Sequence, residues 1–165
     1  MIHLERLGPR HADAILAGQD PALAAEIVGQ RWSRESLDSF LARAARWRAD
    51  GPIREYAAEL DGVLIGGGGL NLLDTGLERG EAALTYWLLA THRGRGHGHV
   101  LAAALVSRAR AEPRISRLVL RIAPTNSASS ALARSLGAER TGEVERHPAD
   151  AARTVDRWVL ELRRS

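Results

Sequence analysis

The amino-acid sequence predicts one α/β domain, with a mixed sheet that carries helices on both faces. The length of 165 residues favours a single domain, which we expect to span residues 1–165. Hydrophobic residues make up 45% and charged residues 26%, an ordinary globular balance. The expected elements run strand, helices, three strands, helix, strand, helix, two strands. This mixed order is typical of an α/β sheet.

The first 50 residues predict one strand followed by helices. Ser33 is a good N-cap, and an apolar stripe at helical spacing follows it. The expected elements are a strand Leu4–Leu7, a helix opened by Pro9 with Ala12, Ile15 and Leu16 on one face, a helix around Ala22–Val28, and a helix with the stripe Leu37, Phe40, Leu41 and Ala44.

A β-hairpin is expected next, and a run of glycines follows it. Tyr56–Leu60 and Val63–Ile65 flank Asp61-Gly62, a pair that tolerates the positive φ of a tight turn. Glycines weaken a strand, so Gly66–Gly69 indicates a bulge or the close approach of another group. A loose loop is the alternative.

The second half predicts strands alternating with helices. Gly137 is well placed to end the shorter helix. The expected elements are a strand Ala82–Leu89, a helix His97–Arg110, a strand Leu118–Ile122, a helix after Asn126 with Ala128, Leu132 and Leu136 on one stripe, and final strands Thr141–Arg146 and Val155–Leu162.

The composition excludes several classes of function. Without cysteine there is no disulfide, no thiolate metal site and no cysteine nucleophile. The chain also contains no lysine, since all 23 Lys and Arg residues are Arg. A Walker phosphate loop and a Schiff-base lysine are therefore excluded as well. No apolar run reaches the roughly 20 residues that span a bilayer, and the first residues are unlike a signal peptide. We therefore expect a cytoplasmic protein with no membrane partner.

Charge is unevenly distributed along the chain. Residues 1–90 contain nine Arg and 13 acidic residues, a net −4, whereas residues 91–165 contain 14 Arg and seven acidic residues, a net +7. The second half is suited to an anion and the first to a cation, unless the surface charge is simply uneven. A total charge of only +3, with 4% aromatic residues, argues against a nucleic-acid partner.

The hexapeptide Arg93-Gly94-Arg95-Gly96-His97-Gly98 lies between a predicted strand and a predicted helix. A helix N-terminus offers free N–H groups and partial positive charge, and glycines let the backbone close around an anion. The loop is thus either a diphosphate cradle or a glycine-rich turn with solvated Arg. His92, His97 and His99 lack nearby carboxylates, and we expect no metal site.

Four segments together resemble the GNAT N-acetyltransferases. Arg93, Gly96 and Gly98 fill the pattern R-x-x-G-x-G of the family's pyrophosphate loop. Three other segments resemble the subgroup that acetylates ribosomal-protein N-terminal alanine: Leu84-Thr85-Tyr86-Trp87-Leu88, Asn126-x-x-Ser129 with Leu136-Gly137-Ala138, and Asp156-Arg157-Trp158. The resemblance covers the whole chain. It implies a mostly antiparallel sheet of six or seven strands, with strands four and five parallel and splayed.

The resemblance also implies a cofactor, acetyl-coenzyme A. Backbone N–H groups of Arg93, Gly94, Arg95, Gly96, His97 and Gly98 would hold its diphosphate. Its pantetheine arm would pair with backbone near Leu88 and Leu89 and contact Asn126. Without the resemblance, Asn126 and Ser129 are ordinary helix caps.

For catalysis, the resemblance implies that Ser129 donates a proton to the leaving thiolate, since the Tyr that many relatives carry is here Ala133. The subgroup's Glu is here Ala83, so Glu81 is a substitute base, although a strand-end surface charge is the simpler interpretation. We expect Thr85, Trp87 and His147 to contact the acceptor.

The predicted function is direct acetyl transfer, in a ternary complex, from acetyl-coenzyme A to a primary amine. The acceptor is either a protein N-terminus or a small molecule, and a homodimer is possible. The missing Tyr and Glu keep a second hypothesis open, a noncatalytic acyl-coenzyme A-binding regulator or sensor.

Overall fold

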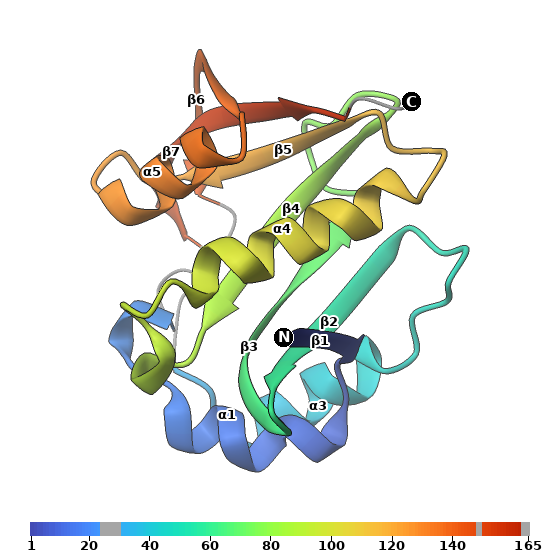
Figure 1. Cartoon of the computed structure of the whole chain (residues 1–165), viewed down its shortest axis with the longest axis vertical. Helices are drawn as coiled ribbons and strands as arrows, with labels where there is room; N and C mark the ends of the chain where they lie inside the picture. The colour runs from blue at the N-terminus through green and yellow to red at the C-terminus, as the bar shows by residue number, and fades with distance from the viewer. Residues whose placement is uncertain (24–30, 148–149, 163–165) are drawn as a thin grey trace.

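One seven-stranded sheet organises the chain (Figure 1). The structure, a computed structural model, describes residues 1–23, 31–147 and 150–162. The strand order is β1-β2-β3-β4-β5-β7-β6, and the pair β4–β5 is parallel whereas the other neighbouring pairs are antiparallel. The strands are β1 (Ile2–Arg6), β2 (Ile53–Leu60), β3 (Val63–Asn71), β4 (Glu81–Leu88), β5 (Arg117–Ile122), β6 (Glu139–His147) and β7 (Asp150–Glu161). This confirms the predicted fold class.

Helices cover both faces of the sheet and define two cores. On one face, α4 and α5 enclose the larger core around Leu101, Leu105 and Trp158. On the other face, α1 and α3 enclose a smaller core around Ile15 and Leu37 (Figure 1). The helices are η1 (Pro9–His11), α1 (Ala12–Gly18), α3 (Arg34–Ala44), η2 (Ala90–His92), α4 (His97–Arg110) and α5 (Ser127–Ser135).

Local signals in the sequence set the helix ends as predicted. Ser33 Oγ accepts a hydrogen bond from the Ser36 N–H, 3.1 Å away, and so caps α3. Gly137 ends α5 at φ +94°, a conformation that other residues rarely adopt. Most of the helix expected around Ala22–Val28 lies outside the described residues.

The glycine run is a regular part of β3 rather than a loose loop. Gly66–Gly69 pair with β2 on one side and β4 on the other, and a register irregularity falls just before them. A Cβ on Gly68 would lie 2.6 Å from Leu105 Cδ1 of α4, and a Cβ on Gly67 would lie 2.6 Å from the Trp87 ring. Close approach on both faces therefore explains the glycines.

The last two strands are longer than their apolar patterns predicted. Pairing reaches His147 opposite Asp150, so β6 extends one residue past the expected Arg146 and β7 begins five residues before the expected Val155. No helix among the described residues combines the length and hydrophobicity needed to cross a bilayer.

We expect Gly68→Ala to destabilise the protein because the added Cβ meets α4 and the β4 backbone. The free energy of unfolding should fall by about 2 kcal/mol, the usual cost of overpacking a core. Urea denaturation measures this. The control Gly8→Ala, at an extended position where the nearest atom lies 3.5 Å away, should have little effect. Equal midpoints for the two variants would contradict the packing argument.

Candidate functional site

A gap in the sheet forms the first part of the site. β4 and β5 pair only where Glu81–Ala83 face Arg117–Val119, and beyond these residues the two strands separate. The remainder of β4 still pairs with β3, so its other edge faces the gap. The gap is a cleft of about 490 Å³ between β4, β5 and the first turns of α4 and α5. The predicted splaying of these strands is thus confirmed.

The predicted phosphate loop closes one end of this cleft. Gly94 and Gly96 have φ +74° and +80°, which a side chain would strain, and Gly96 is the N-cap of α4. No atom lies within 4 Å of a Cβ built on either residue, so the loop leaves open space above its backbone. A Cβ on Gly98 would come within 3.3 Å of Leu132, so the absence of a side chain at Gly98 lets α4 and α5 approach closely. Free N–H groups at the start of α4 suit an anion.

The two arginines of the loop differ in their contacts. Arg93 donates to both carboxylate oxygens of Asp20, at 2.6 and 3.0 Å, and to the Leu88 carbonyl at 2.9 Å. The hydrogen bond from Arg93 lowers the pKa of the Asp20 carboxyl. Arg93 therefore fixes the loop to the N-terminal part of the chain. Arg95 is exposed and forms no ion pair among the described residues, so its charge is available to an anion.

Asn126 and Ser129 line the opposite wall of the cleft. The Asn126 side-chain oxygen accepts a hydrogen bond from the Ser129 N–H at 3.1 Å and caps α5. The capping interpretation is therefore correct, and both side chains also face the cleft. His97 begins α4, and Nδ1 of His99 lies 3.0 Å from Ser135 Oγ.

Tyr86 is a site residue whose role was not predicted. Its hydroxyl donates to Ser129 Oγ at 2.9 Å, and both residues line the cleft. Burial raises the pKa of the Tyr86 hydroxyl, so it stays protonated at neutral pH. Strand alternation predicts that Tyr86 and Trp87 point to opposite faces of the sheet. Nothing in the nearby sequence, however, links Tyr86 to a helix about 40 residues later.

Leu88 and Leu89 have separate surroundings. Leu88 lines the cleft, and its carbonyl already accepts the Arg93 guanidinium. Leu89 lies buried in the smaller core, and its N–H donates to the Ile65 carbonyl at 2.9 Å. The backbone edge open to a pantetheine arm is thus Leu84–Leu88, without Leu89.

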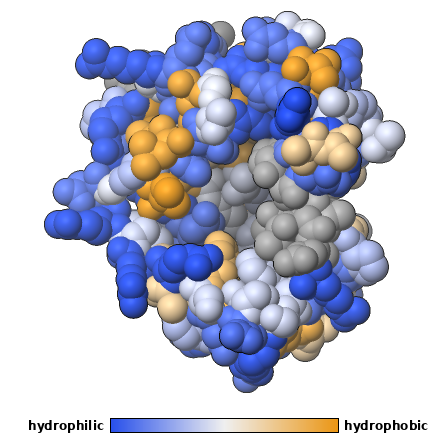
Figure 2. Space-filling view, turned by 180° about the vertical axis from the view of Figure 1, so that it is seen from behind, coloured by the Kyte–Doolittle hydropathy of each residue, from blue (hydrophilic) through white to orange (hydrophobic). Residues whose placement is uncertain are grey.

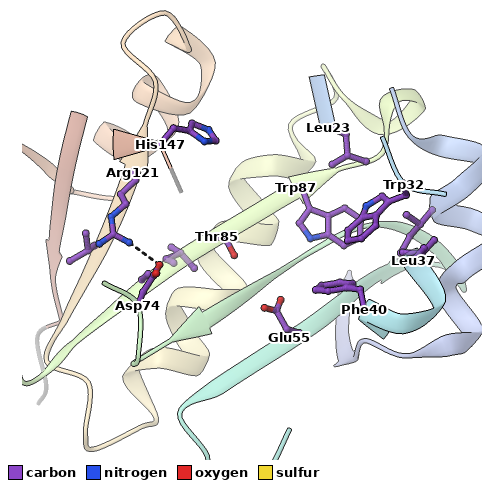
Figure 3. A pocket seen from close by; sticks show the side chains of 14 residues that line it. Leu23, Trp32, Leu37, Phe40, Glu55, Asp74, Thr85, Trp87, Arg121 and His147 are labelled. Carbon is purple, nitrogen blue, oxygen red and sulfur yellow. Dashed lines mark hydrogen bonds and ion pairs between the residues drawn. The ribbon is translucent and has the colours of Figure 1, made fainter. Parts of the chain in front are cut away.

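A second pocket, of about 220 Å³, opens on the α1/α3 side of the sheet. Leu84, Thr85 and Trp87 of β4 line both this pocket and the cleft. The remaining walls come from α1, α3, β2, β5 and β6, and they include His147. Figure 3 shows an aromatic side formed by Trp32, Phe40 and Trp87, and an opposite side where Asp74 pairs with Arg121. The three residues predicted to contact an acceptor therefore lie in one pocket.

Glu55 points into the same pocket (Figure 3). Its carboxylate lies over Gly69, where a Cβ would come within 2.7 Å of Oε2. No described residue forms a hydrogen bond or ion pair with this carboxylate, and burial raises its pKa to about 7. In the sequence Glu55 reads as one of several charged residues of a half-exposed strand. Only the missing side chain at its neighbour Gly69 could have drawn attention to it.

Glu81, the candidate base, lies at the other end of β4 and lines neither pocket. Both of its carboxylate oxygens accept from Arg157 at 2.9 Å, and Arg117 lies 3.4 Å away. Burial alone would raise the pKa of Glu81, but the hydrogen bonds from the Glu78 N–H and Arg157 lower it below its usual value. A paired, buried carboxylate is poorly placed to accept a proton from an amine.

We expect Glu81→Gln to lower the free energy of unfolding by about 3 kcal/mol at pH 7, because it removes the nearest carboxylate from the buried Arg157 and leaves Glu145, 3.6 Å away, as the closest remaining one. The folded pKa of Glu81 is lowered, so its contribution is present above the unfolded value near 4.3 and is lost as pH falls below it. Denaturation of both proteins from pH 3 to 7 measures this. A constant difference across that range would contradict the ion-pair argument.

The surface opposite the view of Figure 1 is mostly hydrophilic, and hydrophobic side chains form separate groups on it (Figure 2).

Comparisons with known proteins agree with this geometry. Spermidine N-acetyltransferase from Vibrio cholerae, in complex with CoA and spermine, superposes with a TM-score of 0.79 at 16% identity, covering 98% of this chain and 95% of that one. Aminoglycoside acetyltransferase AAC(6')-Ib in complex with coenzyme A gives 0.80 at 18% identity, with the same coverage. These proteins do not support the ribosomal-protein N-terminal subgroup. A search of curated protein sequences finds no match.

The family model described as "Acetyltransferase (GNAT) domain" matches residues 2–139, most of the chain. Together with the splayed strands, the glycine loop at α4 and the shared fold, this match establishes the family. The chain belongs to the GNAT acetyltransferase family.

Proposed function

We propose that this protein transfers the acetyl group of acetyl-CoA directly to a primary amine of a small molecule, within a ternary complex. One observation carries the proposal: the cleft and the second pocket meet at Leu84, Thr85 and Trp87. A thioester held in the cleft and an amine held in the pocket therefore face each other across β4. With no cysteine in the chain, an acetyl-cysteine intermediate is excluded.

The cleft has the groups that acetyl-CoA requires. The N–H groups of Gly94–Gly98 and the charge of Arg95 suit the diphosphate. The edge of β4 at Leu84–Leu88 does not pair with β5, so its N–H and C=O groups can pair with the amides of the pantetheine arm. Acetyl-CoA supplies the thioester; the chain supplies position, hydrogen bonds and proton transfer.

The Tyr86–Ser129 pair is the proposed proton donor to the departing sulfur. Ser129 Oγ accepts from Tyr86, which leaves the Ser129 O–H free to donate toward the cleft. Asn126 fixes Ser129 by capping the first turn of α5. A hydroxyl that is itself hydrogen-bonded to a second hydroxyl is a better proton donor than an isolated one. Free N–H groups of β4 are the proposed donors to the oxyanion.

A small-molecule acceptor fits the pocket better than a long peptide does. Its volume of about 220 Å³ lies below the roughly 300 Å³ of the smallest drug-sized sites. The similar solved structures are acetyltransferases of spermidine and of aminoglycosides, both small amines. The noncatalytic alternative was based on a missing Tyr and a missing Glu. Tyr86 in the cleft and Glu55 in the second pocket supply a phenolic hydroxyl and a carboxylate from other positions, which weakens that alternative. The expected homodimer and cytoplasmic location stay predictions.

Release of free thiol from acetyl-CoA, followed over a panel of amines, tests this function. The panel contains monoamines, spermidine, an aminoglycoside, free amino acids and an alanine-led peptide. We expect release with at least one small amine and initial-rate lines that intersect, as a ternary complex requires. Tight CoA binding without thiol release on any amine would instead support the noncatalytic alternative.

We expect Ser129→Ala to lower kcat about 100-fold, the usual contribution of a positioned proton donor, while the Kd for CoA changes little. Tyr86→Phe should lower kcat about tenfold, because it removes one hydrogen bond from the donor. Steady-state kinetics and CoA titration measure both. The neighbouring Ser130→Ala is the control, since Ser130 does not line the cleft. Equal effects at Ser129 and Ser130 would remove Ser129 from the mechanism.

A further inference from the structure

Three strands present one continuous row of residues to the second pocket. Glu55 of β2 pairs with Gly69 of β3, and Gly69 pairs with Thr85 of β4. Because Gly69 has no side chain, β3 places no side chain between the Glu55 carboxylate and Thr85, which lies at the edge shared with the cleft. In the next row, Gly67 makes room for the Trp87 ring in the same way. The glycines thus keep the part of β3 between Glu55 and the edge of β4 free of side chains.

The charges in this pocket leave one carboxylate uncompensated. Besides Glu55, the described charged or titratable side chains that line it are Asp74, Arg121 and His147. Asp74 Oδ2 accepts from Arg121 at 2.8 Å, so these two lining side chains form a neutral pair. The helices packed against Glu55 present Ile15, Leu37 and Phe40 to the pocket, which are apolar. One positive charge on a ligand is therefore matched at Glu55.

The remaining wall is aromatic. The rings of Trp32 and Phe40 lie 5.0 Å apart, and the Trp87 ring, which packs against Gly67, lies beside them (Figure 3). Gln19 fixes the Trp32 backbone through two hydrogen bonds, at 2.8 and 3.0 Å. Such walls attract a flat or branched apolar group, and aromatic faces also attract an alkylammonium. Several separated charges, as on a polyamine, would find no further free carboxylate among the described residues of this pocket.

We infer that Glu55 binds the ammonium group of the acceptor and takes its proton, and that Trp32, Phe40 and Trp87 select a small primary amine with one positive charge on an apolar or aromatic body. This inference rests on the proposed amine acetylation and narrows its substrate class. It excludes amines that carry several positive charges as preferred acceptors.

The proton and bond changes balance as follows. The ammonium gives one proton to the Glu55 carboxylate and becomes a neutral amine. Its nitrogen then bonds the acetyl carbon and the carbon–sulfur bond breaks. Ser129 passes its hydroxyl proton to the departing sulfur, and the second nitrogen proton moves to the Ser129 oxygen, so that the Tyr86–Ser129 pair ends as it began. Products are the amide, the thiol and a protonated Glu55, which returns its proton to solvent. Burial, which raises the pKa of Glu55 to about 7, suits a group that must both accept and release a proton near neutral pH.

The first arm of the test compares substrates and a nonreactive ligand. Wild-type kcat/KM for 2-phenylethylamine should exceed that for spermidine, an aminoglycoside and an alanine-led peptide by at least about tenfold. Benzyltrimethylammonium, which has no N–H to acetylate, should bind in calorimetry without any turnover and compete with the amine. Its binding depends on the pocket alone, so it reports on Glu55 even if no acetylation is found.

The second arm compares Glu55→Gln with Glu59→Gln, which changes the same residue type on the same strand outside both pockets. Glu55→Gln should weaken benzyltrimethylammonium binding at least about tenfold, whereas Glu59→Gln should not. Wild-type kcat/KM should level off between pH 7 and the amine pKa near 10, because Glu55 is ionised there. In Glu55→Gln it should keep rising with the fraction of free amine.

Folding gives an independent control. The pKa of Glu55 is raised from about 4.3 in the unfolded chain to about 7, so the carboxylate lowers stability increasingly as pH rises through this interval. Glu55→Gln should therefore gain stability over the wild type from pH 4 to 7, which excludes misfolding as the cause of lost activity.

The outcomes separate the two proposals. Preference for spermidine or an aminoglycoside, or equal binding of the quaternary probe by wild type and Glu55→Gln, would overturn the inference and leave the proposed function standing. Absence of thiol release on every amine would overturn the proposed function, while the quaternary probe would still decide whether Glu55 binds a cation.

Discussion

The site depends on the early end of pairing between β4 and β5. Three residue pairs join the strands, and the pair Glu81–Arg157 lies at this joined end, where it ties β4 to β7 across β5. Arg117, the register partner of Glu81, adds a third charge at the same place. Past this point the strands diverge, and α4 spans the opening on one face (Figure 1). The buried ion pair thus holds the joined end together, and the cleft begins beyond Ala83, where the pairing stops.

The glycines of β3 are the second constraint, and they act on both faces of the sheet. On the α4 side, Gly68 allows Leu105 to pack against the strand, which holds the start of α4 beside the cleft. On the other side, Gly67 and Gly69 leave space for the Trp87 ring and the Glu55 carboxylate. The second pocket is therefore partly formed by the sheet itself, and a side chain at either position would intrude into it.

Local signals in the sequence were enough to predict the fold and half of the site. The cap at Ser33, the turn at Asp61-Gly62 and the loop Arg93–Gly98 each depend on residues close together in the chain, and each lies where it was predicted. Thr85, Trp87 and His147 share one pocket, and strand alternation had predicted that the first two lie on the same face of the sheet. The subgroup assigned from short motifs was finer than those motifs supported.

The rest depended on contacts between distant residues. Tyr86 meets Ser129 across 43 positions, and Arg157 reaches Glu81 across 76, so no local spacing reveals either pair. The position of Glu81 on β4 made it a reasonable candidate base, but both of its carboxylate oxygens accept hydrogen bonds from Arg157, near the C-terminus. Glu55 differs from Glu81 in this respect. Its sequence position predicts a surface charge, because its burial depends on helices that fold over β2.

Amide hydrogen exchange with and without CoA tests the central claim, that the gap between β4 and β5 holds the cofactor. The amides of Leu84–Leu88 and Gly94–Gly98 should become protected on CoA binding, because they gain partners. Those of Glu81–Ala83, which already pair with β5, should change little. Protection confined to another part of the molecule, with Leu84–Leu88 unchanged at saturating CoA, would contradict the account.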